Sequence, residues 1–206
     1  MLFRSLRRAA ASRRRDQELF VVTESLFGMD GDIAPLTELV AIAQHYGASV
    51  IVDEAHATGC YGTNGQGIVD MLGIRPKILA SIHTGGKALG LMGAYICCSE
   101  LLRDVLVNRC RHFIFTTAAA PVVGSWWLSS LDRVREGHAP REDLHSAARH
   151  FRYRLRHHGM LTPGSEYVVP VILGDNAEAT RVAGLLQRRG WDIRARSEEH
   201  TSELQS

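Results

Sequence analysis

The sequence has almost no lysine: Lys77 and Lys87 are the only two, and arginine supplies the rest of the positive charge. No hydrophobic stretch approaches the roughly 20 residues needed to cross a bilayer, so no membrane span is expected. The net charge of +2 at pH 7 is small and scattered, and it gives no reason to expect a nucleic-acid partner.

Cysteine is also scarce. Cys60, Cys97, Cys98 and Cys110 contain no Cys-x-x-Cys pair and no spacing typical of a metal site. The adjacent Cys97 and Cys98 fall in an apolar, strand-like run and are interpreted as buried packing residues. Four cysteines without a disulfide pattern favour a reducing compartment, so a cytoplasmic location is expected.

A complete phosphate-binding glycine loop is missing as well. The segment Gly85-Gly86-Lys87 lacks the leading glycine spacing of a Walker loop, and Ala88 stands where that loop needs Ser or Thr. This disfavours a nucleotide-binding domain.

What is present is an alternation of apolar runs and amphipathic stretches. Short apolar runs predict strands over residues 19–23, 48–52, 77–81 and 93–98. Helical spacing predicts helices over residues 2–11, 35–46 and 100–108. The later part predicts helices over 122–136, 142–158 and 177–190, and strands over 167–173 and from 191 to 194. The alternation predicts an α/β fold with a mostly parallel sheet, whose ligands would sit outside the carboxyl ends of the strands.

Polar side chains follow two of the predicted strands. Asp53 closes the apolar run over 48–52, His56 comes three residues later, and Lys87 lies in a loop of small residues. A pyridoxal phosphate (PLP) site needs a lysine amine to attach the cofactor and a carboxylate for the pyridinium nitrogen. A buried, desolvated lysine is also a better nucleophile. The hydroxyl of Thr84 is a candidate for contact with the phosphate.

Each of these residues alone also has an ordinary structural explanation. Asp53 suits a strand-to-loop turn, His56 is one of ten histidines, and Lys87 is compatible with a solvated loop. The aromatic and hydroxyl residues of 113–117 could line a pocket or a subunit contact, although the hydrophobic core is the default for such aromatics.

Taken together and in order, five segments resemble the α-oxoamine synthases of the PLP-dependent fold-type I superfamily. The resembling segments are residues 21–36, 52–59, 84–90, 113–117 and 170–176. By this resemblance Lys87 would hold PLP covalently, Asp53 would pair with its pyridine nitrogen, and His56 would contact its ring oxygen and take part in catalysis. Thr84 would contact the cofactor or its phosphate.

The resemblance also implies a homodimer with the site at the subunit interface. Thr116 and Thr117 would then reach the phosphate bound by the neighbouring subunit. Gly28 stands where the family usually has Ser, so a hydroxyl near the cofactor is missing.

The reaction implied is the condensation of an amino acid with an acyl-CoA or acyl-carrier-protein thioester, with decarboxylation. In the most similar member the substrates would be L-alanine and a pimeloyl thioester, in biotin biosynthesis. The alternatives are an activity like glycine C-acetyltransferase, 5-aminolevulinate synthase or serine palmitoyltransferase, or a non-catalytic remnant.

The resemblance divides the chain into four parts. Residues 1–18 would be an Arg-rich helix and linker, 19–137 the C-terminal half of the PLP-binding large domain, and 138–195 part of a smaller α+β domain. Residues 196–206 break the pattern and look like a translated sequencing adapter. The family's first large segment has no counterpart here, so the chain is interpreted as a fragment that is inactive by itself.

Overall fold

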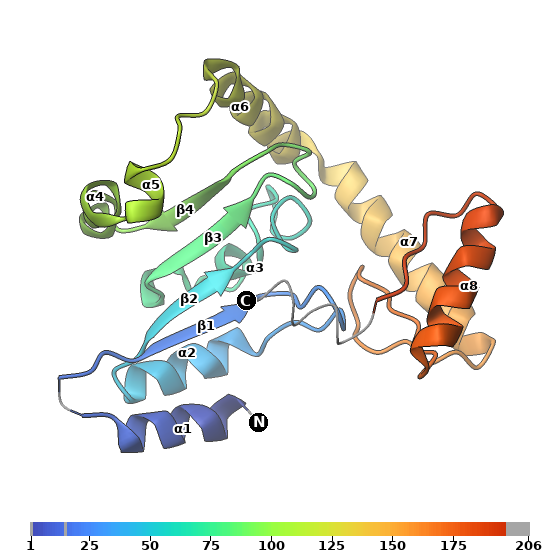
Figure 1. The fold of residues 1–206 in the computed structure, drawn as a ribbon, viewed down its shortest axis with the longest axis horizontal. Helices are drawn as coiled ribbons and strands as arrows, with labels where there is room; N and C mark the ends of the chain where they lie inside the picture. The colour runs from blue at the N-terminus through green and yellow to red at the C-terminus, as the bar shows by residue number, and fades with distance from the viewer. Residues whose placement is uncertain (1, 15, 197–206) are drawn as a thin grey trace.

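The computed structural model describes residues 2–14 and 16–196, which form a four-stranded sheet with helices around it (Figure 1). The strands are β1 Phe20–Glu24, β2 Ser49–Asp53, β3 Ala80–Thr84 and β4 Ala94–Cys98. The helices are α1 Leu2–Ser12, α2 Leu36–His45, α3 Ile68–Met71, the 3-10 turn η1 Arg75–Lys77, α4 Glu100–Arg109, α5 Arg111–Ile114, α6 Pro121–Glu136, α7 His138–His157 and α8 Asn176–Arg188.

The sheet has the strand order β1-β2-β3-β4. The β1–β2 and β2–β3 pairs are parallel, whereas β4 returns antiparallel to β3. The expected mostly parallel α/β sheet is therefore confirmed. The first three strands point the same way, so their carboxyl ends meet at one edge, where ligands bind in open α/β sheets.

The core lies between α2 and one face of the sheet, and Leu6 of α1 and Ile68 and Val69 of α3 are buried in the same cluster. Leu39 and Val40 of α2 and Val52 of β2 are fully enclosed there. Helix α2 ends at His45, one residue before the predicted end. Gly47 closes it as expected, with a φ of +60°, and Ala48 N–H donates to the Ala43 carbonyl at 2.8 Å.

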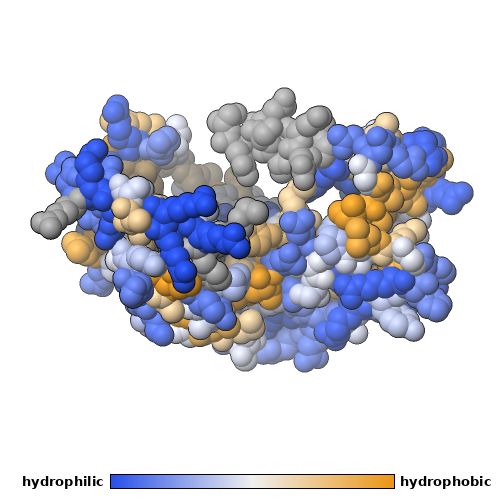
Figure 2. Space-filling model, turned by 90° about the horizontal axis from the view of Figure 1, so that it is seen from below, coloured by the Kyte–Doolittle hydropathy of each residue, from blue (hydrophilic) through white to orange (hydrophobic). Residues whose placement is uncertain are grey.

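The opposite face of β1 is open. Phe20 is 54% exposed and Val22 is 67% exposed, while Val21 between them is buried. Figure 2 shows hydrophobic patches interrupting an otherwise hydrophilic surface. An exposed apolar strand at a sheet edge is a site of self-association, because its backbone groups are also free to pair.

Figure 1 places α4 and α5 beyond β4, at the opposite end of the molecule from α8. The long helix α7 leads from α6 toward α8. Within the part of the chain that the structure describes, no helix is long and apolar enough to cross a membrane.

Several predictions of local structure were wrong. The third strand begins at Ala80 rather than at residue 77, because Arg75–Lys77 form the η1 turn. Pro76 within this turn has no N–H to donate to a strand ladder. Cys97 and Cys98 are half-buried rather than buried, since β4 lies at the edge of the sheet.

The C-terminal part differs more. The expected strands over 167–173 and 191–194 are irregular segments. The bond from Ile172 N–H to the Leu161 carbonyl, 3.0 Å long, is not continued into a ladder within the described residues. A strand without a neighbouring strand has no partner for its backbone groups.

The helix expected over 142–158 begins earlier, at His138, because Pro140 fits the first turn, where no intrahelical N–H bond is needed. Only Gly137 separates α6 from α7. The division between a large and a small domain at this point stays a prediction. The interpretation of 196–206 as a non-native tail lies, apart from Arg196, outside the described residues.

Candidate active site

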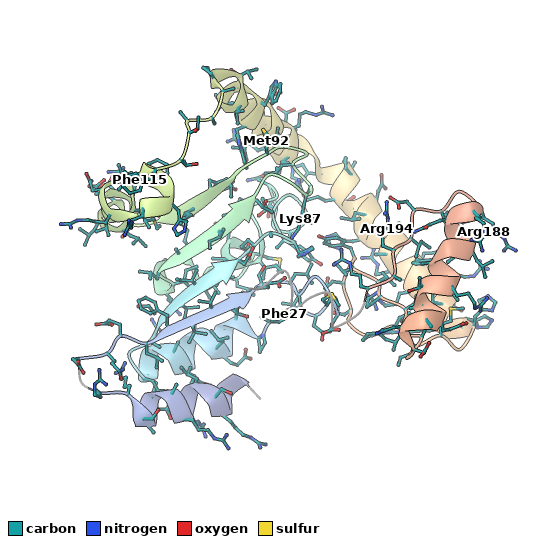
Figure 3. The ribbon with its side chains drawn as sticks, in the orientation of Figure 1. Phe27, Lys87, Met92, Phe115, Arg188 and Arg194 are labelled. Carbon is teal, nitrogen blue, oxygen red and sulfur yellow. The ribbon has the colours of Figure 1, made fainter. Side chains whose placement is uncertain are left out.

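The Lys87 loop lies at the carboxyl edge of the sheet. It connects β3 to β4 and is closed by bonds from Gly85 N–H to the Gly93 carbonyl, 2.9 Å, and from Leu91 N–H to the Gly85 carbonyl, 2.7 Å. Lys87 is exposed in this loop rather than desolvated, because the loop projects beyond the strand ends (Figure 3).

His56 reaches this loop from the turn after β2. Its Nε2 lies 2.9 Å from Nζ of Lys87. The backbone carbonyl of His56 accepts a bond from the Tyr167 hydroxyl at 2.5 Å, so the C-terminal segment supports the turn. The structure therefore brings together two residues that are 31 positions apart in the sequence.

Asp53 is the last residue of β2 and is half-buried. Its Oδ1 accepts a bond from the backbone N–H of Ala55 at 2.7 Å. This bond fixes the direction of the turn that carries His56. It leaves Oδ2 as the oxygen available to a ligand at the strand end.

Gly28 lies against the imidazole of His56. A Cβ at this position would be 2.8 Å from ring carbons Cδ2 and Cε1, and closer still to Nε2. Glycine is therefore required for the observed position of the ring. The backbone N–H of Gly28 donates to Glu24 Oε2 at 3.1 Å, which ties its loop to the end of β1.

Burial and a neighbouring positive charge both disfavour protonation of His56. Burial lowers the pKa of His56 below its usual 6.5, and the positive charge of Lys87 lowers it further, while Glu24 and Asp53 oppose the shift. A neutral imidazole can accept the N–H of the Lys87 ammonium.

The threonines fall into two groups. Thr84 ends β3, and its hydroxyl accepts the Gly86 N–H at 3.4 Å, so it lies at the same edge as Lys87. Thr116 and Thr117 are exposed and follow α5. Figure 3 places the preceding Phe115 beside α5, away from Lys87. The expectation that the aromatics of 113–117 are core residues was wrong, since Phe113 is 60% and Phe115 is 77% exposed.

Sequence reasoning missed Glu54, which is fully enclosed. Its Oε1 accepts the Val69 N–H at 3.3 Å, and burial raises the pKa of its carboxyl. Gly67 makes room for it, because a Cβ there would lie 2.8 Å from the Glu54 carboxyl carbon. The acidic pair that follows an apolar strand was the available signal, but only its first member was considered.

A second missed residue is His83 of β3, which is only 4% exposed. Its Nδ1 pairs with the Thr58 hydroxyl at 2.8 Å and its Nε2 with the Ser81 hydroxyl at 2.9 Å. Its ring stacks on Tyr95, with 4.6 Å between centroids. Burial lowers the pKa of His83 to about 4. The hydrogen bonds of His83 fix the position of β3, the strand that leads into the Lys87 loop.

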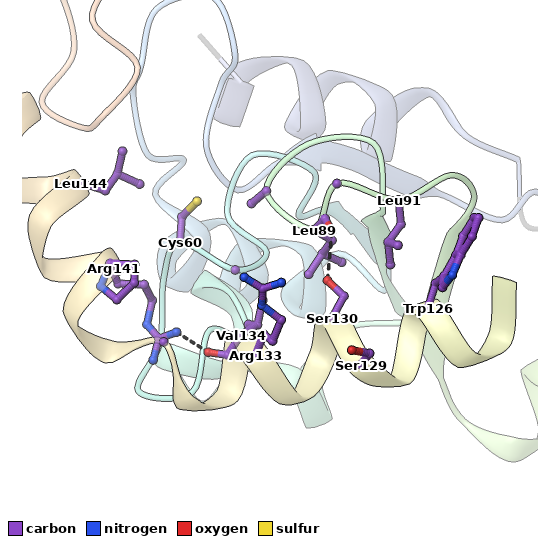
Figure 4. A pocket seen from close by; sticks show the side chains of 15 residues that line it. Cys60, Leu89, Leu91, Trp126, Ser129, Ser130, Arg133, Val134, Arg141 and Leu144 are labelled. Carbon is purple, nitrogen blue, oxygen red and sulfur yellow. Dashed lines mark hydrogen bonds between the residues drawn. The ribbon is translucent and has the colours of Figure 1, made fainter. Parts of the chain in front are cut away.

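A cavity of about 630 Å³ separates the Lys87 loop from α6 (Figure 4). Leu89 and Leu91 line it from the loop, and Trp126 and Arg133 line it from the helix. The Ser130 hydroxyl donates to the Leu89 carbonyl at 2.9 Å, so α6 also positions the loop. Among the described residues, no group of three or more His, Cys, Asp or Glu side chains could hold a metal ion.

The sequence matches a known family model over almost the whole chain. The family model described as aminotransferase class I and II matches residues 3–203. The chain belongs to this family. The expected resemblance is thereby confirmed at the level of the family.

Curated relatives carry a narrower name. An 8-amino-7-oxononanoate synthase from Chlorobaculum parvum is 43% identical over 182 residues, which covers 88% of this chain and 46% of the relative. One from Anaeromyxobacter dehalogenans is 37% identical over 185 residues, covering 89% of this chain and 46% of the relative. The chain thus spans about half the length of the curated relatives that it matches.

Solved structures confirm the PLP-dependent transferase fold. A serine palmitoyltransferase from Sphingomonas wittichii has a TM-score of 0.82 and 28% identity, covering 90% of this chain and 48% of that one. A lysine-to-alanine variant of serine palmitoyltransferase from S. paucimobilis, with a bound PLP–myriocin aldimine, has a TM-score of 0.80 and 30% identity, covering 86% of this chain and 47% of that one. An 8-amino-7-oxononanoate synthase from Francisella tularensis has a TM-score of 0.75 and 27% identity, covering 89% and 54%.

Proposed function

We propose that this chain carries one half of a PLP site and that the whole protein is an 8-amino-7-oxononanoate synthase. The observation that carries the proposal is the convergence of Asp53, His56 and Lys87 at one sheet edge, in a chain 43% identical to such an enzyme. A serine palmitoyltransferase with the same fold binds PLP.

The donor set fits the cofactor. An amine, a carboxylate and an imidazole are the groups that a PLP ring needs for attachment, for its nitrogen and for its ring oxygen. The half-buried Asp53 has one carboxylate oxygen available at the strand end, and the exposed Lys87 amine is open to an incoming aldehyde. When bound, PLP supplies an electron sink for the substrate's α-carbon.

The chain's own residues then have separate tasks. Lys87 Nζ holds the cofactor and afterwards moves the proton at the α-carbon of the amino acid. Asp53 keeps the ring nitrogen protonated through a charge-assisted hydrogen bond. His56 contacts the ring oxygen, Thr84 contacts the cofactor or its phosphate, and Gly28 leaves room for the His56 ring.

Thr116 and Thr117 are assigned to the phosphate of a neighbouring subunit in a homodimer. Their exposure on the segment after α5 supports this assignment. The proposal includes a cytoplasmic location, which agrees with four free cysteines.

The substrates proposed are L-alanine and pimeloyl-CoA or its carrier-protein form. Serine with a long-chain acyl thioester is the second candidate, because serine palmitoyltransferases have TM-scores of 0.80 and 0.82. Glycine C-acetyltransferase-like and 5-aminolevulinate synthase-like activities follow. Assays of a full-length parent with alanine, serine and glycine, each with the matching thioesters, separate these candidates.

Cofactor binding is tested on this chain directly. PLP is added, the product is reduced with borohydride, and peptide mass spectrometry locates the pyridoxyl group. We expect it on Lys87 in the wild-type chain and in Lys77→Arg, and nowhere in Lys87→Arg. Equal labelling of Lys77 and Lys87 would remove the case for a site. The chain alone is predicted to form no amino ketone from alanine and pimeloyl-CoA, and product formation would contradict that.

A further inference from the structure

The His56 ring contacts the Lys87 amine in space left free by Gly28. The proposed contacts of these residues with the cofactor do not account for this direct contact between them. The imidazole Nε2 lies 2.9 Å from the Lys87 amine, in space that any side chain at position 28 would occupy. Lys87 has therefore a proton acceptor at hydrogen-bonding distance before any cofactor is present.

Four charged groups influence His56, and each comes from a different segment of the chain. Lys87 lies on the loop after β3, Glu24 ends β1, Asp53 ends β2, and Arg196 belongs to the C-terminal segment. Two are cations and two are anions. Burial is the strongest influence on the ring, and it favours the neutral imidazole with a free lone pair.

We propose that His56 takes the proton from the Lys87 ammonium when this amine attacks an aldehyde, and that in this chain Gly28 is the positioning residue that lets the ring lie against the amine. Of the three ammonium hydrogens, one passes to His56 Nε2 and then to solvent. The freed lone pair forms the bond to the aldehyde carbon. The other two hydrogens leave with the carbonyl oxygen as water, and a carbon–nitrogen double bond remains.

This inference deepens the proposed function and depends on it only for the natural aldehyde. The test therefore uses formaldehyde with cyanoborohydride, which methylates amines without PLP. Lys77 is the internal reference, because it is the only other lysine of the chain. Peptide mass spectrometry gives the initial rates at both lysines in one sample, and their ratio is measured between pH 5 and pH 8.

In the wild-type chain we expect the Lys87 rate to exceed the Lys77 rate at pH 8, and the ratio to fall below pH 6.5. Protonation of His56 causes this fall, since an imidazolium has no lone pair to offer.

His56→Gln keeps an acceptor oxygen but cannot take up a proton. The ratio of the Lys87 rate to the Lys77 rate should therefore drop roughly 10-fold or more, as expected when a general base is lost. Gly28→Ser should cause a similar drop by displacing the ring. Gly124→Ser is the matched control, because a Cβ there meets nothing within 4 Å, and it should behave as wild type.

Unchanged ratios in both His56→Gln and Gly28→Ser would overturn the inference, as would a wild-type ratio that is flat from pH 5 to pH 8. Both lysines are measured in the same sample. A variant that is generally destabilised would therefore also show a changed methylation rate at Lys77. If PLP labels no single lysine while formaldehyde shows the predicted pattern, the proposed function fails and the inference stands.

Discussion

Acid should destabilise the fold through His83. This ring is only 4% exposed, and burial lowers its pKa from 6.5 to about 4. The unfolded chain therefore binds the proton more tightly than the folded chain, and stability falls as the pH is lowered through this window. Each pKa unit corresponds to about 1.4 kcal/mol, so the loss between pH 7 and pH 4 is about 3 kcal/mol from this residue.

The assay is urea unfolding followed by far-UV circular dichroism at several pH values between 7 and 4. His83→Gln serves as the comparison, since an amide can still bond the Ser81 hydroxyl but does not titrate. Glu54, whose raised pKa acts in the opposite direction, is present in both proteins and cancels in the difference. We expect the wild-type stability to lose about 3 kcal/mol more than the variant on going to pH 4. Identical pH dependence in the two proteins, or a histidine NMR titration near pH 6.5 for His83, would refute the reasoning.

Three further outcomes are expected. Gly67→Ala should lower the free energy of unfolding by about 2 kcal/mol or more, because φ is +112° and the Cβ would overlap the Glu54 carboxylate; an unchanged urea midpoint would speak against this. Tyr167→Phe removes the bond to the His56 carbonyl and should cost about 1 kcal/mol, with faster proteolysis around residue 167 as the readout. Val22→Lys places a charge on the exposed face of β1 and should reduce aggregation measured by light scattering. A wild-type chain that melts sharply as a monomer would show instead that this exposed face does not cause association.

The sheet and the polar residues at its edge were predictable because they depend on short-range patterns. The apolar run before Asp53 specifies a strand, and the buried spacing of α2 specifies a helix, so both were found to within one or two residues. The position of Lys87 after the next parallel strand then follows from topology. Its contact with His56 depends in addition on the space left by Gly28, which no periodicity reveals.

The C-terminal part was less predictable for a physical reason. The apolar residues of 167–173 have strand propensity, but propensity does not supply a neighbouring strand, and the segment is irregular among the described residues. His83 and Glu54 were missed because their burial is a property of the packed molecule. A histidine between two hydroxyls looks the same in the sequence as a histidine on the surface.

The bond between Tyr167 and the His56 carbonyl has a consequence for synthesis on the ribosome. The two residues are 111 positions apart, and at 5–20 residues per second the second emerges about 6 to 22 s after the first. The nascent sheet can form in that interval, but the turn that holds the imidazole waits for its last support. The turn that carries His56 therefore reaches its final structure only after the C-terminal segment has been translated. A translational pause before residue 167 would lengthen the time for which this turn lacks the bond from Tyr167.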